Sequence, residues 1–131
     1  DYGTAKRVAI AASDRCDTAA TGAAVGALQK AGLAVSRLDD VAGLAVMRTV
    51  AMLVNEAADA AMQGIATPAD VDLAMQKGVS YPRGPLAWGD AIGPARVAAV
   101  LANLAAHYGE DRYRTSPRLA RAAQTGGRLG A

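Results

Sequence analysis

The sequence predicts a mainly helical domain preceded by a short strand–helix–strand segment. The first observation is composition: 52% of the 131 residues are hydrophobic, yet Phe is absent and Trp occurs once. Alanine supplies much of this apolar content and is the best helix former, which favours closely packed helices. The second observation is a change of hydrophobic period, from alternation to helical spacing, at Leu44. We therefore expect two parts, residues 1–42 and residues 43–131.

The first part has the pattern of a parallel strand–helix–strand unit. Apolar residues alternate with smaller ones over residues 8–12, as in a half-buried strand. Asp17 is placed to cap a helix that runs to about Lys30, Gly32 ends it, and residues 33–38 form a second strand. This order is the building block of a Rossmann-like sheet. Because two strands alone make a poor sheet, we expect a remnant or linker of a larger Rossmann-like domain.

A long amphipathic helix begins the second part and ends at Gly64. Its apolar residues recur at helical spacing along one side, namely Met47, Val50, Ala51, Val54, Ala58, Ala61 and Met62. Its polar residues are predicted to lie on the other side, namely Arg48, Asn55, Glu56, Asp59 and Gln63.

Shorter helices, separated by proline and glycine, follow the long one. Thr67-Pro68-Ala69-Asp70 is a helix start signal, with a hydroxyl at the N-cap, Pro at N1 and an acid at N3. This helix is predicted to end at Gly78. Residues 81–85 contain two prolines and a glycine, so we expect irregular structure there. Further helices are predicted over residues 86–92, 94–108 and 117–124.

Charge and cysteine content narrow the function classes. The net charge of +2 is too small to indicate a nucleic-acid partner. Cys16 is the only cysteine, which rules out an internal disulfide and suits the reducing cytoplasm. No apolar run is long enough to span a bilayer, so no membrane partner is expected. The chain opens on Asp1 rather than Met, and we expect a processed or excised piece of a longer protein.

An ordered series of motifs carries a family resemblance. It consists of Asn55-Glu56-Ala57, residues 63–72, residues 74–78, residues 81–86, Asp90 and Gly93. At this spacing the series resembles the C-terminal domain of 3-hydroxyacyl-CoA dehydrogenases over residues 39–113, and more loosely over the part before it. The resemblance implies a helical fold of the 6-phosphogluconate-dehydrogenase C-terminal type, which usually forms a dimer contact and closes over the acyl-CoA cleft. For a full-length enzyme it implies NAD, a 3-hydroxyacyl-CoA substrate and a role in fatty-acid β-oxidation or a related pathway. Some bacterial members, including those of phenylacetate catabolism, carry two helical copies in one chain.

The chain departs from the family pattern at a position that the resemblance assigns to catalysis. Where the family motif ends in Asn-Arg, this sequence has Met47-Arg48. A thioether is a weak acceptor and no donor, so Met47 cannot replace the amide. The family's catalytic His and Glu belong to a Rossmann domain that is mostly absent, and no G-x-G-x-x-G follows a strand here. We therefore expect no catalytic, cofactor-binding or metal residue in this chain, and a second, degenerate helical copy.

Other chemically suggestive residues have structural interpretations that we favour. His107 lies in the last turn of a helix, where the dipole favours it, and it lacks companions for a metal site. Glu56 and Asp59 are spaced like a general-acid pair but more often form a solvated helix face. Asp90 is expected to tie down an adjacent loop.

Two further features leave a binding interpretation open. Tyr81 and Trp88 flank the proline-rich segment and either pack in the loop or contact an acyl chain. The late arginines form a solvated surface or contact the phosphates of coenzyme A, and they are Arg112, Arg114, Arg118, Arg121 and Arg128. If the apolar stripe of the long helix is wider than one core can cover, the remaining apolar residues would form a dimer face. The candidate interface residues are Met47, Val50, Val54, Met62, Tyr81 and Trp88.

The sequence thus indicates the helical domain of a cytoplasmic NAD-dependent 3-hydroxyacyl-CoA dehydrogenase, serving dimer or domain assembly and cleft closure rather than catalysis. Its expected partners are the catalytic Rossmann domain or first helical copy of the parent chain, and a second copy of itself. The alternative is a stand-alone module that binds an acyl-CoA or another acidic ligand.

Overall fold

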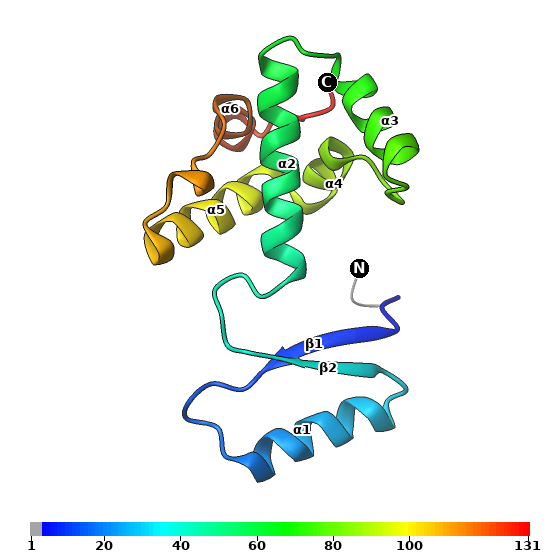
Figure 1. Cartoon of the computed structure of the whole chain (residues 1–131), viewed down its shortest axis with the longest axis vertical. Helices are drawn as coiled ribbons and strands as arrows, with labels where there is room; N and C mark the ends of the chain where they lie inside the picture. Colours follow the sequence, from blue (N-terminus) through cyan, green and yellow to red (C-terminus); the bar gives the residue numbers. More distant parts are fainter. Residues whose placement is uncertain (1–3) are drawn as a thin grey trace. The chain divides into compact units, whose positions relative to one another are not determined.

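The computed structural model describes residues 4–131 and divides into two compact units (Figure 1). Unit 1 extends to Leu44, and unit 2 comprises Ala45–Ala131. Unit 1 contains two strands and one helix, whereas unit 2 consists of helices joined by irregular segments. The predicted architecture, a mainly helical chain with a short parallel strand pair near its start, is confirmed.

Unit 1 is built from β1 (Arg7–Ala11), α1 (Thr18–Lys30) and β2 (Ala34–Leu38). The strands pair in parallel, with Val8 opposite Val35, and α1 runs along the pair (Figure 1). Asp17 caps α1 as predicted, because its Oδ1 accepts the Ala20 amide at 2.6 Å. Within the described part of unit 1, Thr21 alone is buried. A strand pair with this thin core matches the predicted remnant rather than a complete sheet.

Unit 2 is organised around its longest helix. Its elements are α2 (Val46–Met62), α3 (Pro68–Gly78), α4 (Pro85–Ile92), α5 (Pro94–Tyr108), the 3-10 turn η1 (Asp111–Tyr113) and α6 (Pro117–Thr125). Helix α2 contacts all four of the other α-helices and passes between them in Figure 1. Among residues 4–131, no helix is both long and apolar enough to cross a membrane.

Proline starts and glycine stops set the helix boundaries of unit 2. Each of α3, α4, α5 and α6 has Pro in its first turn, where the missing N–H costs nothing. Thr67 caps α3 as predicted, accepting the Asp70 amide at 3.2 Å. Gly109 ends α5 with φ 66°, a left-handed conformation that favours glycine. Pro85 begins α4 instead of belonging to the preceding loop, and the turn η1 was not predicted.

Burial along α2 corrects the predicted division into one apolar and one polar side. Ala51, Val54 and Ala58 are fully buried, as the apolar spacing predicts, but Met62 at the helix end is 40% exposed. Asn55, placed on the polar side from its spacing, is only 2% exposed, so that placement is wrong. The physical reason is the central position of α2: neighbours on several sides bury more of its circumference than one apolar stripe.

Candidate functional site

Met47, which the resemblance places at the asparagine of the family motif, lies in the first turn of α2 and is half-buried. The chain reaches it through Gly43 and Leu44, which have φ 78° and 45°. A left-handed conformation costs a non-glycine residue such as Leu44 about 1–2 kcal/mol. Contacts with the surrounding structure must therefore stabilise the backbone conformation at the start of α2.

The neighbouring Arg48 contacts two tyrosines, Tyr108 and Tyr113. Its guanidinium lies 4.7 Å from the centre of the Tyr108 ring and 5.5 Å from that of Tyr113. It also donates to the Tyr108 hydroxyl at 3.2 Å and to the Tyr113 hydroxyl, and the two rings stack at 5.4 Å. Cation–π attraction and charged hydrogen bonds thus fasten the first turn of α2 to α5 and η1. Arg48, predicted to lie on the polar side of the helix, is half-buried.

A second tie joins the middle of α2 to the segment before α6. Asn55 Nδ2 donates to the Arg114 carbonyl at 2.9 Å, and Asn55 Oδ1 accepts the Ser116 amide at 2.7 Å. Ser116 is completely buried and caps α6 through the Leu119 amide. An unpaired amide at such a position is costly, so the Asn55 side chain is an obligatory partner. The sequence contains a signal for the burial of Asn55, though not for its partners, because Asn55 directly follows Val54 of the apolar series.

The carboxylates of α2 do not form a catalytic pair. Asp59 lies 3.5 Å from Arg114 and accepts from Gln63 at 2.9 Å, whereas Glu56 is exposed. Asp59 is therefore engaged in structural contacts with its neighbours. The predicted solvated face describes Glu56, whereas the Asp59 side chain is only 16% exposed and paired with Arg114.

Asp72 of α3 fixes the start of α4. Its two oxygens accept the amides of Leu86 and Ala87 at 2.7 and 2.9 Å, satisfying donors that a helix start leaves free. Gly84 packs so closely on Asp72 that a Cβ would overlap its carboxylate. The aromatic pair beside this loop is also internal, because the rings of Tyr81 and Trp88 lie 5.6 Å apart and both residues are half-buried. These contacts favour the interpretation that Tyr81 and Trp88 pack within the loop rather than contact an acyl chain.

The late arginines are mostly occupied within the chain. Arg112 pairs with Glu110, Arg114 with Asp59, and Arg128 with Asp90 at 3.3 Å. Arg118 donates to the carbonyls of Leu129 and Ala131. These contacts favour the structural interpretation over a coenzyme A phosphate site.

The remaining candidates are spread over unit 2. His107 is exposed and touches the Tyr108 ring edge-on at 4.6 Å. Val50 is half-buried, and Val54 is completely buried, so Val54 belongs to the core rather than to a contact surface. Within residues 4–131, no three His, Cys, Asp or Glu side chains are placed to hold a metal ion.

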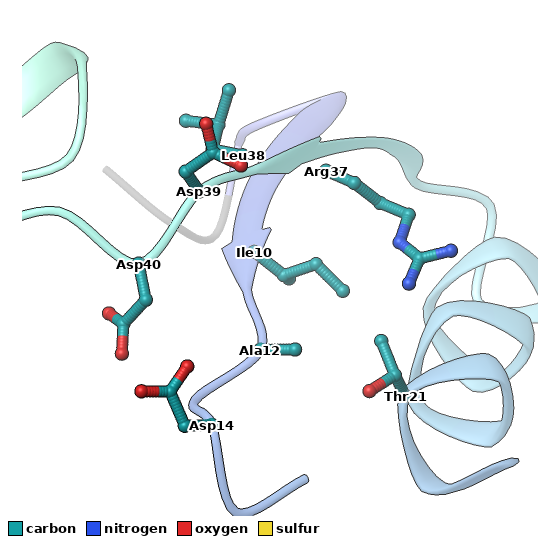
Figure 2. Close-up of a pocket in the computed structure, with 8 residues that line it drawn as sticks. All are labelled: Ile10, Ala12, Asp14, Thr21, Arg37, Leu38, Asp39 and Asp40. Atoms are coloured by element: carbon teal, nitrogen blue, oxygen red, sulfur yellow. The ribbon is translucent and has the colours of Figure 1, made fainter. Parts of the chain in front are cut away.

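Unit 1 contains a cavity of about 460 Å³ at the carboxyl ends of its strands. Figure 2 shows its lining, which is Ile10, Ala12, Asp14, Thr21, Arg37, Leu38, Asp39 and Asp40. In this view Asp14 and Asp40 lie near one another at one side, while Arg37 extends toward α1. Ligands of open α/β sheets bind at this edge, so the cavity is where a Rossmann-type ligand would be sought.

Fold and site together define a helical dehydrogenase C-terminal domain that follows a shortened Rossmann-type unit. The sequence profile of the 3-hydroxyacyl-CoA dehydrogenase C-terminal domain matches residues 43–131. That of the 3-hydroxybutyryl-CoA dehydrogenase reduced Rossmann-fold domain matches residues 1–41. The chain belongs to the 3-hydroxyacyl-CoA dehydrogenase family.

Several relatives are much longer than this chain. The 3-hydroxyadipyl-CoA dehydrogenase of Escherichia coli K12 is 48% identical over 109 residues, which are 83% of this chain and 23% of that protein. A probable 3-hydroxybutyryl-CoA dehydrogenase of Deinococcus radiodurans is 34% identical over 75% of this chain and 35% of that protein. The crystal structure of 3-hydroxybutyryl-CoA dehydrogenase from Escherichia coli K12 matches with a TM-score of 0.86 and 45% identity, over 91% of this chain and 25% of that one. The matched stretches therefore span only 23% to 35% of the length of these relatives.

The cavity of unit 1 does not fit NAD, the cofactor that the family implies. A dinucleotide diphosphate needs a glycine-rich turn and free amides at a helix start. Residues 12–17, which join β1 to α1, contain no glycine, and the Asp17 carboxylate already occupies the helix start. Asp14 and Asp40 in the cavity lining would add further repulsion toward a diphosphate. This unit keeps the strand–helix–strand topology without the features that hold the cofactor.

Proposed function

We propose that this chain is the second, catalytically silent helical copy of a longer NAD-dependent 3-hydroxyacyl-CoA dehydrogenase, together with the reduced Rossmann unit before it. The proposal is supported by the family match over residues 43–131, together with the resemblance that places Met47 where the family motif has its catalytic asparagine. The stretches 1–42 and 43–131 are its two domains. The intact ties through Arg48 and Asn55 support a retained scaffold.

The proposed role is assembly and cleft closure. Unit 2 would pair with the first helical copy or the catalytic Rossmann domain of the parent chain, and with a second copy of itself, so that an acyl-CoA cleft is complete. Apolar side chains left exposed on unit 2 support a contact role, for example Ile65 at 73%, Leu73 at 51% and Met62 at 40% exposed. Half-buried Met47, Val50, Tyr81 and Trp88 are the further candidates for that surface. The free, exposed Cys16 fits a cytoplasmic location.

Light scattering on the purified chain tests the assembly role, with a homodimer as the expected result. Met62→Asp should shift the chain toward monomer, because it places a charge in the proposed apolar contact. Gln76→Asp, at an exposed polar position of α3, is the matched control and should leave the mass unchanged. A clean monomer for the unaltered chain at high concentration contradicts homodimer assembly.

Calorimetric titration with acetoacetyl-CoA distinguishes the alternative, a stand-alone acyl-CoA-binding module. A silent assembly domain predicts no saturable heat, because the arginines that would bind phosphate are engaged within the chain. Saturable binding that is lost on altering Arg121, an exposed late arginine, would favour the binding module instead.

A further inference from the structure

The cavity of unit 1 lies where the two parallel strands end together. Ile10 pairs with Arg37 across the strands, so both side chains lie on one face of the pair. Thr21 of α1 also lines the cavity and is only 8% exposed, so α1 covers that face. The segments that follow β1 and β2 leave the same edge and contribute Asp14 and Asp40. The volume of about 460 Å³ falls in the range of small-molecule sites, roughly 300–1,000 Å³.

Opposite charges lie on different sides of this cavity. In Figure 2 the guanidinium of Arg37 extends toward α1, whereas Asp14 and Asp40 lie near one another on the other side of the view. The side chains of Ile10 and Ala12 lie between these two sides. The lining therefore has a cationic region, an apolar middle and an anionic region.

The charged groups on the two sides are not paired within the part of the chain that the structure describes. Among residues 4–131, the side chains of Arg37, Asp14 and Asp40 make no hydrogen bond or ion pair with another residue. The other arginine of the strand pair differs, because Arg7 donates to the Ser36 hydroxyl at 3.0 Å. A free guanidinium presents a planar fork of donors that matches a carboxylate, and two neighbouring carboxylates attract an ammonium group. Each side of the cavity thus prefers a different ligand group.

The same lining argues against other kinds of small ligand. The described residues place no three His, Cys, Asp or Glu side chains so that they could hold a metal ion. A phosphate ester would meet three carboxylates, Asp14, Asp39 and Asp40, against a single guanidinium. A wholly apolar molecule would exclude water from the charged groups without pairing them. A ligand with one cationic and one anionic end avoids each of these costs.

We propose that the cavity of unit 1 binds a small zwitterion, with an ammonium group at one end, a carboxylate at the other and an aliphatic stem between them. Asp14 and Asp40 bind the ammonium group, Arg37 binds the carboxylate, and Ile10 and Ala12 contact the stem. Because the three charged side chains are exposed, each ion pair contributes little, and the expected Kd is on the order of 1 mM. The site belongs to unit 1 and is independent of the role proposed for the whole chain.

A nuclear magnetic resonance titration of the full chain tests the site. The probes are 4-aminobutanoate, 5-aminopentanoate and 6-aminohexanoate, which differ only in the length of the stem. At least one of them should saturably shift the amide resonances of residues 10–14, 21 and 37–40. Pentylamine and pentanoate, which each lack one charged end, should bind about three- to fivefold more weakly than the best zwitterion. The proposal is overturned if no zwitterion gives a saturable shift, or if pentylamine binds as tightly as the best of them.

Two variants assign the ends of the ligand. Arg37→Gln should weaken binding of the zwitterion about three- to fivefold and leave pentylamine binding unchanged, whereas Asp14→Asn should weaken both. Both side chains are exposed and unpaired among residues 4–131, so neither change removes a contact within the described chain. Arg7→Gln is the matched control, because Arg7 belongs to the same strand pair but does not line the cavity. Equal affinity of Arg37→Gln and Arg7→Gln for the zwitterion would contradict the assignment of Arg37 and with it the proposed site.

Discussion

Replacing Asn55 by leucine should destabilise unit 2 by about 2–4 kcal/mol, because a buried backbone amide would lose its acceptor. The amide belongs to Ser116, which is completely buried and donates to Asn55 Oδ1 at 2.7 Å. The Arg114 carbonyl would lose its donor as well. Leucine keeps the branched shape of asparagine and is larger, so the effect does not come from a cavity.

Urea unfolding followed by circular dichroism measures this effect as a fall in the midpoint at constant m-value. Glu56→Leu is the matched control, since Glu56 is the next residue of the same helix and is exposed. The control should remain within about 0.5 kcal/mol of the unaltered chain. If Asn55→Leu were equally neutral, the tie between α2 and the start of α6 would not exist in solution.

Gly89→Ala is expected to reverse the usual effect of replacing a helical glycine. In an open helix position this change stabilises by about 0.5–1 kcal/mol. At Gly89 the added Cβ would lie 2.6 Å from both Leu129 and Val54, which are completely buried. Val54 is β-branched and stiff, so the overlap should cost a net of about 1–3 kcal/mol.

The control for Gly89 is Gly78→Ala at the end of α3, where an added Cβ meets nothing within 4 Å. Thermal unfolding should show a lower Tm for Gly89→Ala and an unchanged or slightly higher Tm for the control. Adding Val54→Ala to Gly89→Ala should restore part of the loss relative to additivity, because it removes one overlapping methyl. Strict additivity of the two changes would indicate that these residues do not touch.

Local signals explain why the helices of both units were predictable. Thr67 and Asp17 were assigned as caps from the residues beside them, and the structure confirms both. Gly109 ends α5 because glycine adopts a left-handed conformation that other residues avoid. Such boundaries depend on a few consecutive residues, so a single sequence contains the necessary information.

Distant contacts explain what could not be predicted. Asn55 is paired with residues 59 and 61 positions away, and Arg48 with aromatic rings 60 and 65 positions away. Leu129 lies in a glycine-rich tail that has no hydrophobic period, yet it completes the core. A prediction from hydrophobic periodicity considers one helix at a time. It places a polar residue in solvent, because the residue's distant partner is not known. The assignment of Met47 to the family's asparagine position stays a prediction, made from a contiguous motif.

In the function proposed above, unit 2 keeps its scaffold but has lost its chemistry. Arg48 and Asn55 still fasten α2 to the rest of unit 2, so the first turn that carries Met47 is in place. Asp17 and the glycine-free residues 12–17 leave unit 1 without a diphosphate site. Restoring the amide alone should therefore not restore a reaction, because the resemblance implies that the acid–base residues belong to another domain.

The most direct test is an assay of this chain and its Met47→Asn variant with NAD and 3-hydroxybutyryl-CoA, following NADH formation. An active relative, such as the 3-hydroxybutyryl-CoA dehydrogenase from Escherichia coli K12, is the positive control. The account predicts no rate above the buffer blank for either protein, although both remain folded by circular dichroism. Turnover by the unaltered chain that increases in proportion to its concentration would contradict the proposal of a silent domain.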